Sequence, residues 1–115
     1  MQSAVDKETA EQYLRDAEPM WRAFWFHMHL MAKNLEQFSE GLKTIDDQVY
    51  LYHSEGHKND LAKWVREVIG DGALADDLEK VQTRDEAISV TERRVEELKE
   101  AVGNSRERKA ESGKQ

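Results

Sequence analysis

Apolar side chains recur every three or four residues along most of this chain, which is the spacing of one α-helix face. A first stripe runs from Ala10 to Ala17 and ends before Pro19, because a residue preceding proline avoids the helical region. A second stripe follows Asn34, a residue type that caps helix N-termini, and consists of Leu35, Phe38, Leu42 and Ile45. The pattern therefore predicts a chain built mainly from short amphipathic helices.

Gly41 lies inside the second predicted helix, where glycine costs up to about 1 kcal/mol relative to alanine. Its missing side chain leaves room for a neighbouring element to approach closely. Asp46 and Asp47 offer the next cap, before the short apolar segment 49–53. We interpret that segment as a helical turn, because a lone strand between two helices has few pairing partners.

Residues 59–81 predict two helices separated by a sharp break. Asn59 caps the first helix, and Asp60 lies in its first turn, where the helix dipole favours an anion. Gly70 is placed to end this helix in the left-handed conformation, and Asp71 caps the shorter helix that follows. With the second stripe, these helices supply the expected core, namely Leu35, Phe38, Leu42, Leu61, Trp64, Val65, Val68, Leu74 and Leu78.

The last predicted helix opens with the capping box Thr83–Glu86 and ends at Gly103. Its apolar seam consists of Ile88, Thr91, Val95, Leu98 and Val102. This seam covers about two heptads, which is short for an independent coiled coil. We expect it to fold back on its own domain, which slightly favours a monomer over a homodimer because folding back avoids the entropy cost of association.

The segment 20–31, MWRAFWFHMHLM, is ambiguous between helix and strand. As a helix it would be apolar on nearly all sides and hence central. As a strand it would place Trp25, His27, His29 and Met31 on one face and Phe24, Phe26, Met28 and Leu30 on the other. We prefer the helix because no other segment reads as a pairing partner, with an extended segment near 24–30 as the alternative.

These elements predict a mainly α fold, a small single-domain bundle of about five to six helices. The helical domain covers residues 5–102, after a frayed N-terminus at 1–4 and before a disordered tail at 103–115. A chain of 115 residues has room for one such core.

Composition narrows the function classes. The net charge is −7, divided between a body of −9 and a tail of +2 at residues 103–115, so general nucleic-acid binding is not expected. The chain has no cysteine, which excludes disulfides and thiolate metal sites. It has no apolar run of roughly 18 residues and starts with a polar segment, so we expect neither membrane insertion nor a signal peptide. We expect a cytoplasmic protein.

Five short motifs together resemble a small prokaryotic domain family of unknown function that is frequent in archaea. They are Phe24-Trp25-Phe26 (F-x-F), residues 32–38 (A-x-N-L-x-x-F), Tyr52-His53, residues 59–64 (N-D-[FL]-x-x-W) and residues 70–75 (G-D-x-x-L-A). The resemblance covers about residues 24–81 and leaves out the N-terminal and long C-terminal helices. Family members often have a glycine soon after F-x-F, where this chain has Met28-His29. The resemblance implies a recurring module, sometimes beside other domains, and supplies no activity.

The histidines are the candidates for metal chemistry. His27 and His29 would share one strand face, and His53 and His57 are four residues apart. The chain therefore has enough imidazole side chains to supply the ligands of a zinc site. Neither a cysteine nor an H-E-x-x-H motif supports such a site. We therefore predict no metal and no cofactor.

His53 has two interpretations. It could be an acid/base group oriented by Asp60 or Asp71, or a structural histidine that packs on Trp64 and bonds Asp60. We favour the structural role, because the sequence shows neither a nucleophile nor a cofactor loop. The cluster that is functional or structural consists of His53, Asn59, Asp60, Trp64 and Asp71. The alternative function is a histidine-centred enzyme or metal-binding protein that uses His53 with His27 and His29.

The aromatic segment also predicts an interaction surface. Segments of this composition are most often core, but a domain this small has difficulty burying two neighbouring tryptophans. Trp, Phe and Met are the side chains that anchor protein interfaces, which here gives Trp21, Phe24, Trp25, Met28 and Met31. We conclude from the sequence that the chain is a non-catalytic regulatory or protein-interaction module with a protein partner.

Overall fold

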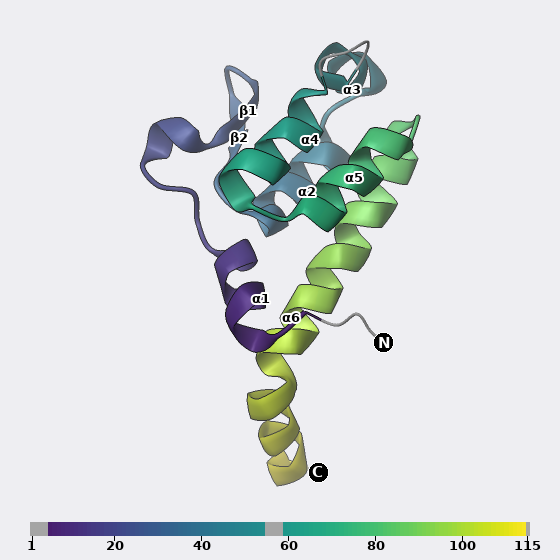
Figure 1. The fold of residues 1–115 in the computed structure, drawn as a ribbon. Helices are drawn as coiled ribbons and strands as arrows, with labels where there is room; N and C mark the ends of the chain where they lie inside the picture. The colour runs from purple at the N-terminus through teal and green to yellow at the C-terminus, as the bar shows by residue number, and fades with distance from the viewer. Residues whose placement is uncertain (1–4, 55–58, 115) are drawn as a thin grey trace.

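The long C-terminal helix α6 (Arg84–Lys114) organises the fold, and three of the other helices pack along it (Figure 1). The computed structural model describes the backbone of residues 5–54 and 59–114. It describes side chains as far as Gly103, except for the side chain of Met20. In chain order, the elements before α6 are α1 (Lys7–Leu14), η1 (Met20–Arg22), β1 (Phe24–His27), β2 (Leu30–Ala32), α2 (Leu35–Thr44), α3 (Asp47–Ser54), α4 (Asp60–Trp64), the π-helical turn η2 (Val65–Ile69) and α5 (Gly72–Lys80). The mainly α, single-domain prediction is confirmed.

The seam of α6 is covered by the domain's own helices α1, α2 and α5. Thr91 and Leu98 are fully buried there, and Val95 is nearly so. Ile88 and Val102 are partly buried against the same core. Ion pairs from α2 to α6, Lys43 with Glu92 and Glu36 with Lys99, lie beside this contact.

The helix preferred for residues 20–31 is wrong, because β1 and β2 form an antiparallel hairpin there. The strand's pairing partner is the end of the same segment, so no distant strand is needed. Phe24 and Phe26 are buried and Trp25 and His27 are exposed, which is the alternation of a sheet with one face on the core. A bulge lies between Trp25 and His27, next to the turn at Met28.

Local capping rules predicted the helix starts well. Each predicted cap side chain accepts a hydrogen bond from the backbone N–H three residues later, and these residues are Asn34, Asp46, Asn59, Asp71 and Thr83. The predicted stop is also confirmed, because Gly70 has φ 94° and lies in the left-handed region.

The helix that Gly70 ends is not α-helical throughout. Its last turn, η2, is a π-helix, in which the Gly70 N–H donates to the carbonyl oxygen of Val65 at 2.8 Å. Such turns hold one residue more than an α-turn and often occur at functional sites. The side chains of Val68 and Ile69 leave the helix from this wider turn.

The end of α6 differs from the prediction. The helix continues through Gly103 to Lys114, where the sequence predicted a stop and a disordered tail. One glycine inside a helix costs only about 1 kcal/mol, and the segment 106–110, RERKA, consists of good helix formers. These residues continue the helix beyond the glycine.

The predicted core is confirmed with one exception. Eight of its nine members are buried, and Val68 is only partly so. Gly41 is buried against the ring of Phe26, so the close approach expected at this glycine is present. No helix in the described part of the chain has both the length and the apolar character needed to cross a membrane.

Candidate functional site

His53 lies at the junction of three elements. It projects from α3, and only 6% of its surface is exposed. Its Nδ1 is 3.1 Å from Oδ2 of Asp60 in the first turn of α4, and its Nε2 is 2.8 Å from the carbonyl oxygen of Phe26 in β1. The ring therefore joins the hairpin to two helices.

Both partners of His53 are hydrogen-bond acceptors when Asp60 is ionised. A neutral imidazole carries a single N–H and can donate to only one of them. The doubly protonated ring donates to both, and one of these bonds is then charge-assisted by the carboxylate. This arrangement suits a structural joint, because it occupies both ring nitrogens with protein groups.

An aromatic cluster surrounds this joint. The ring of Phe24 contacts His53 edge-on at a centroid distance of 5.0 Å and Trp64 at 5.9 Å. Phe24 thus takes the place beside His53 that the sequence analysis gave to Trp64. Trp64 stacks on Phe38 at 5.2 Å, and its indole N–H donates to the carbonyl oxygen of Arg22 at 2.7 Å.

The predicted cluster is only partly assembled. Asp60 meets His53, and Asn59 caps α4 and donates from Nδ2 to the carbonyl oxygen of Leu78 at 3.4 Å. Asp71 has a different partner: its two carboxylate oxygens accept from Nε and an Nη of Arg94 at 2.7 and 2.9 Å.

Sequence reasoning missed Arg94. Asp71 is completely buried, so its charge requires a partner. Burial opposes a charged Arg94, but the carboxylates of Asp71 and Glu97 outweigh it and raise the pKa of Arg94. One feature of the sequence could have indicated Arg94: it lies three residues after Thr91 and therefore next to the apolar seam of α6. The pair connects the start of α5 to the middle of α6.

Of the proposed histidine metal set, His53 forms the joint, and His27 and His29 do not bond to it. His27 and His29 are exposed at the hairpin turn, with ring centroids 6.3 Å apart, and Nδ1 of His27 accepts from the His29 N–H at 3.2 Å. His57 lies outside the described residues. Among the described residues, no group of three or more His, Asp or Glu side chains is arranged to hold a metal ion.

The predicted interaction surface divides between core and solvent. Trp21 is 77% exposed, Trp25 48% and Met28 76%. Phe24 is buried and Met31 partly buried, so the prediction that Phe24 belongs to an exposed surface is wrong. In the strand, Phe24 and Trp25 necessarily point to opposite faces. The exposed side chains Trp21, Trp25 and Met28 are called the aromatic patch below.

A family model matches residues 22–113, and the matching family is described as one of unknown function, DUF5752. The chain belongs to DUF5752. The match confirms membership of a family of unknown function, and it is longer than the resemblance indicated. It includes most of α6, which the resemblance had left out. Neither the curated proteins nor the solved structures contain a match.

The DUF5752 match includes the hairpin, the histidine joint and the Asp71–Arg94 pair. Helix α1 precedes the match and packs against α6 and η2. Features formed only by residues 22–113 are therefore located in the family module. Features that involve α1 combine the module with residues that precede it.

Proposed function

We propose that this DUF5752 domain is a non-catalytic interaction module that binds a protein partner through the aromatic patch. The observation that carries the proposal is the exposure of three bulky apolar side chains, Trp21, Trp25 and Met28, on one short segment. Tryptophan and methionine are enriched in interfaces and anchor them as hot spots.

The hairpin that carries Trp25 and Met28 is attached to the core through its buried face. Phe26 is inserted against α2 at Gly41, and its carbonyl oxygen is bonded to His53. The backbone of Arg22 is bonded to the indole of Trp64. A surface presented on a fixed backbone loses less entropy on binding than a mobile one. The buried residues therefore support the patch as a preorganised surface.

The charge of the chain indicates the kind of partner. At −7 the domain attracts proteins of opposite charge at long range, and complementary charge raises association rates. We propose a partner with an apolar pocket for the tryptophans and a basic rim. We further propose that the free domain is a monomer, because Thr91, Val95 and Leu98 are already buried within the chain.

The test starts with capture of the partner from the native host by the intact chain, followed by purification of the captured protein. Isothermal titration calorimetry then compares the wild type with Trp21→Ala, Trp25→Ala and Met28→Ala. Loss of a hot spot weakens affinity about tenfold or more. Leu51→Ala is the matched control, because Leu51 is an apolar side chain on α3 that is 48% exposed, like Trp25.

The proposal is wrong if the triple variant Trp21→Ala/Trp25→Ala/Met28→Ala binds the partner as tightly as the wild type while keeping its melting temperature. Sedimentation of the free chain tests the monomer separately. A dimer that dissociates on Trp25→Ala would make the second copy the occupant of the patch.

A further inference from the structure

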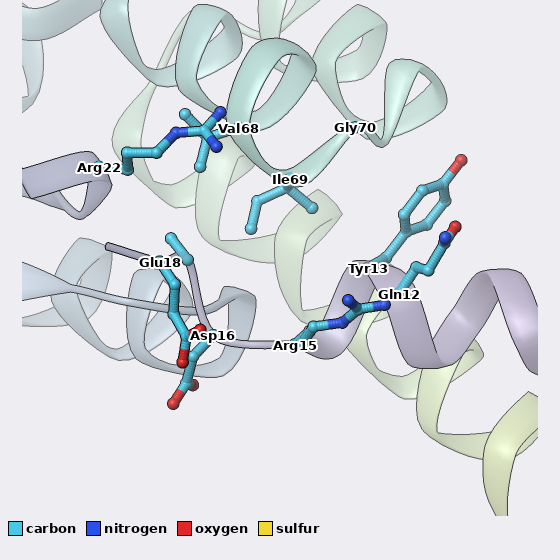
Figure 2. Close-up of a pocket in the computed structure, with 10 residues that line it drawn as sticks. Gln12, Tyr13, Arg15, Asp16, Glu18, Arg22, Val68, Ile69 and Gly70 are labelled. Carbon is cyan, nitrogen blue, oxygen red and sulfur yellow. The ribbon is translucent and has the colours of Figure 1, made fainter. Parts of the chain in front are cut away.

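A cleft of about 420 Å³ lies between α1, the connection to η1 and the π-helical turn η2 (Figure 2). Its side chains include Tyr13 and Arg15 from the N-terminal part, Arg22 from η1, and Val68 and Ile69 from η2. The volume is within the range of small-molecule sites in proteins. The cleft is distinct from the aromatic patch in its lining and chemistry.

Two arginines in this cleft have no partner for their guanidinium groups among the described residues. Arg66, Arg84 and Arg94 each bond carboxylates. By contrast, the side chains of Arg15 and Arg22 form no hydrogen bond or ion pair within the described part of the chain. Arg15 is exposed and Arg22 is half-buried, so two guanidinium groups that are always charged are available to an anion in this cleft.

The backbone that carries these arginines is fixed. The N–H of Ala17 donates to the carbonyl oxygen of Lys33 at 2.6 Å, and the carbonyl oxygen of Arg22 accepts from Trp64 at 2.7 Å. The connection between the arginines is thus attached to the core near both ends. A site on an anchored backbone is preorganised for its ligand.

The acidic side chains of the cleft do not close it to anions. Asp16 accepts a hydrogen bond from Nδ2 of Asn34 at 2.7 Å. In Figure 2 the carboxylates of Asp16 and Glu18 point away from Ile69, and the guanidinium groups of Arg15 and Arg22 lie on either side of it. The part of the cleft next to η2 therefore combines two arginine side chains with an apolar wall.

We propose that this cleft binds a small organic anion, with its carboxylate or phosphate group held by Arg15 and Arg22 and its apolar body on Val68 and Ile69. Guanidinium groups present paired N–H donors that match both oxyanions. The apolar wall is formed by the π-helical turn, a feature frequent at functional sites. Because Arg22 belongs to the DUF5752 match and Arg15 precedes it, the complete site needs both parts of the chain.

Titration of the intact ¹⁵N-labelled chain tests this site by NMR. Inorganic phosphate, phenyl phosphate and phenylpropionate are the probes, so that phosphate and carboxylate sources are distinguished. We expect saturable shifts at the amides of Arg22, Ile69 and Gly70, with phenyl phosphate or phenylpropionate binding more tightly than inorganic phosphate. Arg15→Gln and Arg22→Gln should each weaken binding about tenfold or more.

Two variants complete the experiment. Arg93→Gln is the matched control, because Arg93 is an exposed arginine without a side-chain partner among the described residues and lies on α6, outside the cleft. It should bind the probes like the wild type. Arg15→Lys keeps the positive charge but loses the paired N–H donors of the guanidinium group. Its affinity for the probes should lie between those of the wild type and Arg15→Gln.

Two results would overturn the proposal. One is the absence of saturable shifts with every probe at roughly 10 mM. The other is binding that Arg15→Gln, Arg22→Gln and Arg93→Gln leave equally unchanged, which shows an adventitious ion only. If a glutamine variant loses its wild-type circular dichroism spectrum, the comparison of Arg15→Lys with the wild type decides.

Discussion

A Cβ atom on Gly41 would lie 2.2 Å from Cε2 of the Phe26 ring, which is too close for two carbon atoms that are not bonded to each other. On a solvent-exposed helix, Gly→Ala stabilises by about 1 kcal/mol. Here Phe26 is 3% exposed and its ring packs against the rings of Phe24 and Phe38, so we expect Gly41→Ala to destabilise the domain by about 1–3 kcal/mol. Urea denaturation followed by circular dichroism measures this.

Gly72→Ala is the matched control for Gly41→Ala. A Cβ on Gly72, the first residue of α5, would meet nothing within 4 Å. We expect its midpoint to equal or slightly exceed that of the wild type. If Gly41→Ala is as stable as Gly72→Ala, the hairpin does not pack on α2 at this glycine.

Trp64 should be among the most costly side chains to remove. It is 7% exposed, stacks on Phe38 and donates a hydrogen bond to Arg22. Trp64→Ala is expected to lower the free energy of unfolding by about 3–5 kcal/mol. Trp21→Ala, in which a 77% exposed ring is removed, should change it by less than about 0.5 kcal/mol. Equal losses in the two variants would contradict the described core.

The buried Asp71–Arg94 pair predicts that removing Arg94 lowers the free energy of unfolding much more than removing Arg66. Arg94→Met leaves the carboxylate of Asp71 buried without its charged partner, which costs about 3–5 kcal/mol. Arg66→Met removes the ion pairs with Asp76 and Glu79. All three side chains are well exposed, so the free energy of unfolding should fall by less than about 1 kcal/mol. The double variant Asp71→Asn/Arg94→Met completes a mutant cycle, and a coupling near zero would contradict the pair.

Tyr50 predicts a loss of stability in alkali. Burial raises the pKa of its phenol above the ordinary value near 10, and a hydrogen bond with the Ser54 side chain, which stabilises the ionised oxygen, opposes this in part. The unfolded chain therefore releases this proton at lower pH than the folded chain. The contribution is fully present below about pH 10 and is lost as pH rises through the folded pKa.

Melting temperatures between about pH 9 and 11 test this. Tyr50→Phe should decline less steeply than the wild type, and Tyr52→Phe, on the same helix but with an exposed ring, should follow the wild type. Glu92 raises the pKa of Lys43 and Glu36 that of Lys99, which gives a background common to all three proteins. Identical slopes for Tyr50→Phe and the wild type would refute the burial effect.

For metals, we expect no specific zinc binding at physiological concentrations. His27 and His29 lie on the exposed hairpin turn, and both nitrogens of His53 face protein acceptors. Zinc titration followed by histidine NMR shifts provides the measurement. A stoichiometric micromolar site that is lost in His27→Ala or His53→Ala would contradict this expectation.

The parts of this fold that could be predicted from sequence depend on local rules. A cap needs only its own side chain and the N–H three residues later, so Asn34, Asn59 and Asp71 marked their helices correctly. Gly70 ended its helix for an equally local reason. The stripes at helical spacing identified the large side chains that the long helices bury, but they did not include Phe24 and Phe26 of the hairpin or Tyr50 of α3.

The parts that failed depend on contacts that spacing does not encode. The hairpin alternates correctly in sequence, but its partner strand is only three residues long and was not recognised as a strand. Asp71 looked like an ordinary cap, and only the fold brings Arg94 to it. The candidate anion cleft joins Arg15 to Ile69 across 54 positions of sequence, so no local motif could have indicated it.

The π-helical turn Val65–Ile69 also has a consequence for how this chain tolerates changes in length. Each residue of an α-helix turns the chain by about 100°, so one residue more or less rotates everything that follows. The π-helical turn accommodates one extra residue in a single turn, so a deletion inside η2 that restored an ordinary α-turn would leave Asp71 close to its orientation toward Arg94. Among homologous chains, a deletion of one residue should therefore be more frequent within η2 than within the neighbouring α-helices, where it would rotate everything that follows.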